Sequence, residues 1–232
     1  MGAKRKHIVF IDDSADELAT FERLYSGGRF KVTAIQARKP SVALKQVTER
    51  LGADTPDLFV LDLFLPQTDT APTGLSPGAA QKARDQIASI IDAVSGLSRS
   101  FDDGNRLLKE AHGVVVESQR LLSQLCQELR QSPRGGIKLM KDLDREYPGV
   151  PKVFYSRKAV IGDVKEAMRA GALDVLSKPH PSVEDREAPG LMEDFARCCA
   201  GQPSAWLTQW MEHLPHWASG FTAKFPADRA RK

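Results

Sequence analysis

The feature that most constrains the fold is a regular alternation of short apolar runs with amphipathic helical patterns. Three runs are short and almost wholly apolar, as in strands buried on both faces of a parallel sheet: 7–11, 30–35 and 58–61. The helical patterns between them begin at Ser14 and Pro40 and end at Gly27 and Gly52, which are common start and stop residues. This strand–helix order predicts right-handed crossovers and a doubly wound sheet.

Two long helical patterns then interrupt the alternation, between stretches 71–78 and 132–136 that are rich in Pro, Gly and Ser. Their apolar residues recur at alternating spacings of three and four, as in a coiled-coil seam. The first carries Ala80, Ala83, Ile87, Ile90, Val94, Leu97 and Phe101, and the second Leu108, Ala111, Val115, Ser118, Leu122, Leu125 and Leu129. Turn residues at 102–105 join them, which predicts an antiparallel helical coiled-coil hairpin.

A second apolar stripe flanks this predicted seam. It consists of Leu107, Val114 and Leu121 on the second arm, with Ile91 on the first. An isolated pair of helices cannot bury such a stripe. We therefore expect the hairpin to pack on the domain, on a second copy as a homodimer, or on another protein.

The alternation resumes after the hairpin, with strands predicted at 150–155 and 172–176. Removing residues 70–134 leaves five strands alternating with five helices. The predicted fold is therefore an α/β domain with a doubly wound five-stranded parallel sheet and an inserted hairpin. We divide the chain into a first part of the domain at 1–69, the insert at 70–134, a second part at 135–200 and an amphipathic tail at 201–232. The apolar face of that tail carries Trp206, Leu207, Trp210, Met211 and Leu214.

Charge and cysteine content exclude several classes of protein. Lys plus Arg is 33 against 30 for Asp plus Glu, and a net charge of +3 predicts neither nucleic-acid nor membrane attraction. The 3 cysteines, two of them adjacent, have neither disulfide nor metal-ligand spacing. No apolar run approaches the roughly 20 residues of a membrane span, and the basic start lacks the long apolar run of a signal peptide. We expect a reduced, cytoplasmic protein.

Charged and hydroxyl side chains stand where the predicted strands end. Asp12 and Asp13 follow the first strand, Asp62 the third, Ser156 the fourth and Lys178 the fifth. In an open parallel sheet, ligands bind at this edge, near a topological switch point. Three clustered carboxylates repel one another unless a divalent cation lies between them, and hard oxygen ligands favour Mg²⁺. A lysine suits a phosphoryl group, and a central carboxylate can act as a nucleophile.

These motifs resemble the receiver domain of two-component response regulators, whose fold is flavodoxin-like. The resemblance covers residues 6–69 and 135–200, and the hairpin is a departure from it. It is carried by four fragments: Phe10-Ile11-Asp12-Asp13, Leu61-Asp62-Leu63-Phe64-Leu65-Pro66, Ser156, and Ser177-Lys178-Pro179.

The resemblance implies a role for each site residue. Asp62 would accept a phosphoryl group from the phosphohistidine of a histidine kinase or phosphotransfer protein. Lys178 would pair with the phosphate, placed by a cis peptide before Pro179, and Ser156 would move toward the phosphoryl oxygen. Mg²⁺ would be coordinated by Asp13, Asp62 and the backbone carbonyl of Phe64, with Asp12 assisting.

Three residues depart from the family pattern. Arg157 follows the hydroxyl where a small residue is usual; we expect it to face solvent, or else to cover the pocket. Val175 stands where many members carry an aromatic switch residue. Phe64 is bulky and would slow attack by hydrolytic water.

The sequence thus favours a phosphorylation-dependent signalling switch that acts through contacts with a downstream protein, through its helical insert. It would not be an enzyme beyond its own phosphoryl transfer, and the tail is too short for a DNA-binding output domain. The alternative is a receiver-like scaffold or adaptor that is not phosphorylated. A magnesium-dependent phosphatase is disfavoured, because Phe64 stands where its general acid would be. The residues after His112 are Gly113, Val114 and Val115, which lack the acidic and polar character of a phosphotransfer site, so we expect a structural or exposed histidine.

Overall fold

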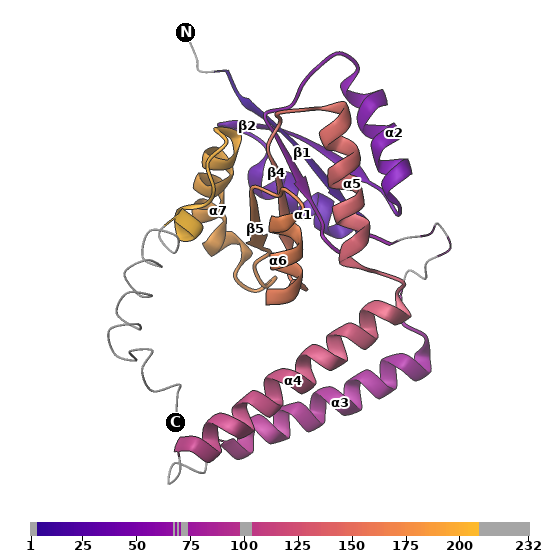
Figure 1. Ribbon diagram of the computed structural model, residues 1–232, viewed down its shortest axis with the longest axis vertical. Helices are drawn as coiled ribbons and strands as arrows, with labels where there is room; N and C mark the ends of the chain where they lie inside the picture. The colour runs from indigo at the N-terminus through magenta and orange to yellow at the C-terminus, as the bar shows by residue number, and fades with distance from the viewer. Residues whose placement is uncertain (1–3, 67, 69, 71–73, 98–103, 209–232) are drawn as a thin grey trace, which may run out of the picture.

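A computed structural model describes residues 4–66, 68, 70, 74–97 and 104–208. Its centre is a five-stranded sheet in the order β2-β1-β3-β4-β5, with every pair parallel (Figure 1). The strands are β1 (Lys6–Asp12), β2 (Phe30–Gln36), β3 (Leu58–Leu61), β4 (Lys152–Ser156) and β5 (Asp174–Ser177). The helices are α1 (Ala15–Tyr25), α2 (Pro40–Leu51), α3 (Pro77–Leu97), α4 (Gly104–Glu128), α5 (Pro133–Glu146), α6 (Ile161–Arg169) and α7 (Glu184–Cys199).

Helices cover both faces of the sheet. On one face, α1 and α7 bury an aromatic cluster that includes Phe10, Phe21, Tyr155 and Phe195. On the other face, α2, α5 and α6 pack on the aliphatic side chains of β1, β3 and β4. Strands β1, β3 and β4 are therefore buried on both faces of the sheet, and β1 and β3 read as continuous apolar runs. The edge strand β2 is only partly buried. The predicted doubly wound fold is confirmed.

Local signals set the helix boundaries as the sequence indicates. The Ser14 side chain accepts a hydrogen bond from the Glu17 backbone N–H and caps α1. After α2, Gly52 adopts a φ of 56°, which a side chain would strain, and the chain turns back toward β3.

Helices α3 and α4 form an antiparallel pair inserted between β3 and α5, and most of it projects away from the sheet (Figure 1). The C-terminal end of α4 packs on the domain, where Cys126 is buried and Leu122 is half-buried against the core beside α5. The chain leaves α4 through Arg130, which has a φ of 52°, and Gln131 forms an isolated bridge with Pro66. The base of the insert thus lies directly beside the loop that follows β3.

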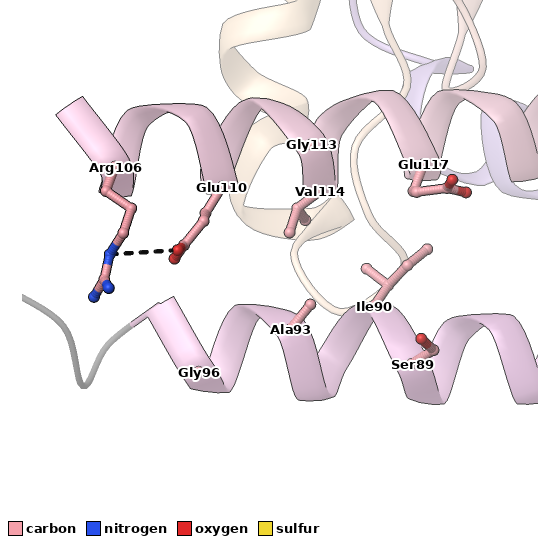
Figure 2. A pocket seen from close by; sticks show the side chains of 9 residues that line it. All are labelled: Ser89, Ile90, Ala93, Gly96, Arg106, Glu110, Gly113, Val114 and Glu117. Atoms are coloured by element: carbon pink, nitrogen blue, oxygen red, sulfur yellow. Dashed lines mark ion pairs between the residues drawn. The ribbon is translucent and has the colours of Figure 1, made fainter.

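The predicted register of the seam between the two arms is wrong. Leu108 is 69% exposed and Val115 is 52% exposed, although both were assigned to the seam. Instead, Val114 points toward Ile90 and Ala93, and these residues line a groove of about 550 Å³ between the helices (Figure 2). The flanking stripe, not the predicted one, therefore faces α3.

The rotation of α4 has a physical cause. The helix carries two apolar stripes, and the stripe that contains Leu122 packs on the domain at the base of the insert. That contact turns Val114 and the buried Leu121 toward α3. Farther from the domain, large apolar side chains of both helices stay exposed. They are Ile87, Ile91 and Val94 on α3, and Leu108, Val115 and Val116 on α4.

Some predictions fall outside the described residues. The turn at 102–105 lies there at 102 and 103, as do Phe101 and the tail beyond 208, with Trp210, Met211 and Leu214. None of the described helices is both long enough and apolar enough to cross a membrane.

Candidate functional site

The carboxyl edge of the sheet brings the predicted site residues together. Asp12 ends β1, Asp62 directly follows β3, Ser156 ends β4 and Lys178 directly follows β5. Strand β2 lies on one side of β1, and β3 lies on its other side, so the direction in which strands are added to the sheet reverses after β2. A crevice at this switch point is the usual ligand site of such sheets.

Lys178 is the centre of the site. Its Nζ lies 2.5 Å from Asp12 Oδ2, 3.5 Å from Asp62 Oδ1 and 3.7 Å from Glu17 Oε2. The lysine side chain is 6% exposed and the two aspartates are 2% and 5% exposed. Burial alone would lower the pKa of Lys178, but the charges of Asp62 and Asp12 raise it above its usual value. The amine is therefore a fixed positive charge beside two buried carboxylates.

The parallel strand order 2-1-3-4-5 and this cluster at the switch point decide the fold type. The chain has the receiver fold. No family model matches the sequence, and no curated protein matches it.

Solved structures with the same fold are response regulators of low sequence identity. The LuxR-family two-component response regulator from Aurantimonas sp. SI85-9A1 is 13% identical, with a TM-score of 0.49, and the match covers 89% of this chain and 94% of that one. The signal receiver domain of the putative response regulator NarL from Mycobacterium tuberculosis is 14% identical, with a TM-score of 0.46 over 86% and 100%. The Mn²⁺-bound form of response regulator Rcp1 is 12% identical, with a TM-score of 0.46 over 82% and 94%.

Burial and the charge of Asp62 raise the pKa of the two neighbouring carboxyl groups, Asp12 and Asp13. Burial raises the pKa of Asp12 to about 7 and outweighs the attraction of Lys178, while the charge of Asp62 adds to the rise. Burial and the charge of Asp62 also raise the pKa of Asp13. Backbone N–H groups oppose this repulsion, because Ser14 donates to Asp12 and Phe64 donates to Asp62. Burial in the pocket therefore disfavours the charged forms of Asp12 and Asp13.

A cavity of about 400 Å³ joins these groups to solvent, and all five predicted side chains line it: Asp12, Asp13, Asp62, Ser156 and Lys178. Their carboxylate oxygens are the hard ligands that Mg²⁺ prefers, so the donor chemistry fits a divalent cation. Among the described residues, however, no three His, Cys, Asp or Glu side chains are grouped closely enough to hold a metal ion as they stand. Lys178 and backbone amides satisfy the carboxylates instead.

Two residues of the pocket were not predicted from the sequence. The Nε2 of Gln131 donates to Asp13 Oδ2 at 3.0 Å, and Lys158 Nζ donates to Gln131 Oε1 at 2.6 Å. Gln131 comes from the end of the insert, 69 positions after Asp62, and only the folded chain brings it to the site. Lys158 stands two residues after Ser156, and this spacing is its only sequence signal.

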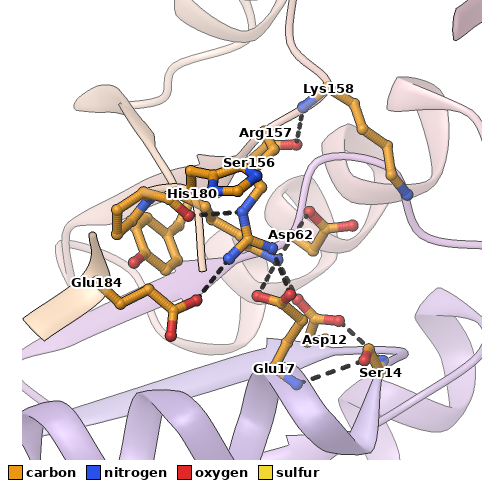
Figure 3. A network of polar contacts seen from close by, with 12 residues as sticks. Asp12, Ser14, Glu17, Asp62, Ser156, Arg157, Lys158, His180 and Glu184 are labelled. Carbon is orange, nitrogen blue, oxygen red and sulfur yellow. Dashed lines mark hydrogen bonds and ion pairs between the residues drawn. The ribbon is translucent and has the colours of Figure 1, made fainter. Parts of the chain in front are cut away.

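Arg157 does not face solvent as expected. Its Nε donates to the Pro179 carbonyl at 2.7 Å, its guanidinium also pairs with Glu17 of α1 and with Glu184 of α7, and its side chain is 29% exposed (Figure 3). It lines the same cavity as Asp62. The alternative prediction therefore describes it better, because it covers one side of the pocket and ties β4 to two helices.

The remaining site residues are placed as follows. Ser156 is buried, and its Oγ accepts a hydrogen bond from the Lys158 backbone N–H at 3.3 Å. The Phe64 side chain is buried in the core, and Lys158 Nζ lies 5.9 Å from its ring centre. Val175 packs on the same core from β5. His112 is exposed on α4 and does not line the cavity, as expected.

The predicted cis peptide before Pro179 is wrong. The bond is trans, as are all peptide bonds in the described part of the chain. A trans bond before proline is favoured by about 0.5–1 kcal/mol, and in this conformation the Pro179 carbonyl accepts its hydrogen bond from Arg157. Lys178 reaches the carboxylates from the trans backbone.

Proposed function

We propose that this chain is a phosphorylation-dependent signalling switch of a two-component system, with Asp62 as the phosphoacceptor. The observation that carries the proposal is the placement of the Lys178 amine 3.5 Å from the Asp62 carboxylate inside an acidic pocket. A domain with only a structural role gains nothing from burying several mutually repelling carboxylates at one strand edge. Their arrangement is suited to receiving a charged group.

The proposed reaction is transfer of a phosphoryl group from the phosphohistidine of a histidine kinase or phosphotransfer protein. A carboxylate oxygen of Asp62 attacks the phosphorus, and the phosphorus–nitrogen bond of the donor breaks as the new bond forms. The donor nitrogen leaves with the electron pair. Lys178 pairs with the incoming phosphoryl oxygens, and Ser156 is the hydroxyl at the neighbouring strand end. The chain acts on itself and not as an enzyme on a separate substrate.

We propose Mg²⁺ as the cation of this site, held by Asp12, Asp13, Asp62 and the backbone carbonyl of Phe64. When bound, it supplies positive charge that offsets the repulsion among these carboxylates and the phosphoryl oxygens. The residues of the chain do the remaining work. Lys178 fixes Asp12, the Phe64 N–H orients Asp62, and Arg157 restricts the opening of the cavity.

We propose that the switch signals by binding a downstream protein through its helical insert. The supporting observation is the row of exposed apolar residues on the insert, which includes Ile91 at 58% and Leu108 at 69% exposure. A phosphoryl group brings a charge of about −1.5 to −2 into the pocket, next to the base of the insert. Homodimerisation through the insert stays a prediction, and a cytoplasmic location is proposed with the two-component role.

One observation favours the alternative, a receiver-like scaffold that is not phosphorylated. Arg157 bonds Glu17, Pro179 and Glu184 at once, and it would restrict access of a donor to Asp62. The acidic pocket and its amine favour the switch, because a scaffold does not need them.

The test is incubation with a small-molecule phosphodonor and Mg²⁺, followed by intact mass measurement. We expect a phosphoryl-sized gain in the wild-type protein and none in Asp62→Asn. The matched control is Asp92→Asn, which removes an exposed carboxylate from α3 and should react like the wild type. No gain in any of the three proteins would contradict the switch and support the scaffold.

A further inference from the structure

A glutamine from the insert stands between two charged residues of the pocket. The Gln131 amide donates to Asp13 Oδ2 at 3.0 Å and accepts from Lys158 Nζ at 2.6 Å. It thus orients the carboxylate on one side and keeps the ammonium group on the other. Both charged side chains line the cavity that contains Asp62.

The backbone of Gln131 is fixed from two directions. Its N–H donates to the Cys126 carbonyl at 2.8 Å, a bond that closes the last turn of α4. It also forms a bridge with Pro66, which lies four residues after Asp62. Cys126 is itself buried in the domain core. The backbone of Gln131 therefore connects the end of α4 to the loop that follows Asp62.

We propose that Gln131 is a positioning residue for the cation ligand Asp13, and that through it cation binding in the pocket stabilises the base of the insert. The proposal rests on the function proposed above. The amide holds one oxygen of Asp13, which leaves the other in a set orientation. It also holds Lys158 away from Asp13 and Asp62, where its ammonium group would compete with a cation. Both effects increase cation affinity.

The test measures Mn²⁺ and Mg²⁺ affinity of the full chain by titration calorimetry. Gln131→Met keeps the volume of the side chain and removes both hydrogen bonds. We expect its affinity to be about tenfold lower than that of the wild type, the loss usual for partners of metal ligands. The matched control, Gln127→Met, changes an exposed glutamine four residues earlier and should bind like the wild type.

The measurements distinguish failure of the proposed function from failure of the role of Gln131. If the wild type binds no cation, the proposed function is wrong. If the wild type and Gln131→Met bind equally well, Gln131 does not position Asp13 and only the further inference is wrong. In the double variant Gln131→Met with Lys158→Met, we expect part of the affinity to return; a double variant as weak as the single one would refute the role of Lys158.

Hydrogen exchange measures whether the cation protects the base of the insert. If Gln131 had only a structural role, its substitution would not change this cation-dependent protection. Coupling between two sites is reciprocal, so the cation should protect the segment that strengthens its site. We expect Mn²⁺ to slow exchange of the amides at 126–131 in the wild type and in Gln127→Met. In Gln131→Met this protection should be lost, while exchange in β1 stays unchanged. Equal protection in all three proteins would overturn the link to the insert.

Discussion

Two consecutive glycines let α5 lie directly against the loop that carries Asp62. A Cβ built on Gly136 would lie 2.5 Å from the Leu63 carbonyl oxygen and 2.7 Å from the Asp62 carbonyl oxygen. At Gly135, it would lie 2.4 Å from the Leu65 carbonyl oxygen. The Gly136 N–H also donates to Leu63 O at 3.2 Å. We therefore predict that Gly136→Ala destabilises the protein and disturbs the loop that carries Asp62.

The size of the effect follows from these contacts. All three atoms nearest to the added Cβ belong to the backbone, so no side chain can rotate away. Moving from 2.5 Å to an ordinary contact of 3.4 Å needs a displacement of about 0.9 Å between α5 and the loop. Such overpacking costs about 1–3 kcal/mol, and loss of the N–H bond costs about 1 kcal/mol more. The higher helix propensity of alanine relative to glycine offsets about 1 kcal/mol of this cost.

We expect a net loss of about 1–3 kcal/mol, which lowers the Tm of a chain of this size by about 2–12 °C. The assay is thermal unfolding followed by circular dichroism, with Mn²⁺ affinity as a second readout because Asp62 lies in the displaced loop. The control is Gly190→Ala, in an exposed part of α7 where the added Cβ has no atom within 4 Å. It should raise the Tm by about 2–4 °C. If Gly136→Ala unfolds like the wild type or gains as much as Gly190→Ala, the reasoning about this contact is refuted.

Three further variants test the pocket and the insert. Asp13→Asn should raise the Tm by about 2–4 °C at pH 8, a gain on the order of 1 kcal/mol. Because the folded-state pKa of Asp13 is raised, ionisation costs stability as pH rises from the unfolded to the folded pKa. The gain should therefore shrink as the pH falls toward the unfolded pKa of about 3.9, and a gain independent of pH would contradict this cause. Arg130→Gly should stabilise the protein by about 1 kcal/mol, because Arg130 has a φ of 52°. The control Arg120→Gly lies within α4 and should destabilise the protein by as much. Both changes are measured by chemical denaturation. Arg157→Ala should lower the stability of the protein by about 1 kcal/mol, because it removes partly exposed ion pairs and hydrogen bonds. The control is Arg134→Ala at an exposed position. Equal stability of the two variants would exclude a stabilising role of Arg157.

Much of the fold follows from the sequence because buried parallel strands have a distinctive pattern. Runs such as 7–11 and 58–61 are apolar on both faces and are bounded by helix signals, and the strands formed there are completely buried in their central residues. Ser14 and Gly52 mark helix ends for reasons that are local to the chain, so their roles could be predicted. Long-range packing was not needed for any of these assignments.

The rotation of α4 could not be predicted because it depends on a contact far away in the sequence. Val114 and Val115 are equally apolar neighbours, and either could face α3 by helical spacing. The packing of Leu122 and Cys126 against the domain core determines which of the two residues faces α3. Periodicity identifies the stripes on a helix, but the partner of each stripe is a property of the assembled fold.

The candidate site divides in the same way. Asp12, Asp62 and Lys178 could be predicted because each stands at a strand end, and topology brings strand ends together. Gln131 and the bonds of Arg157 could not, since they depend on where a loop and an insert return.

The position of the insert places its base beside the acidic pocket. It leaves the sheet after β3 and returns before α5, so its two ends lie beside the loop that carries Asp62. Pro66 and Gln131 pair at these ends, and Gly136 holds α5 against the carbonyl groups of Asp62 and Leu63. A shift of that loop would therefore act on the base of the insert through these backbone contacts.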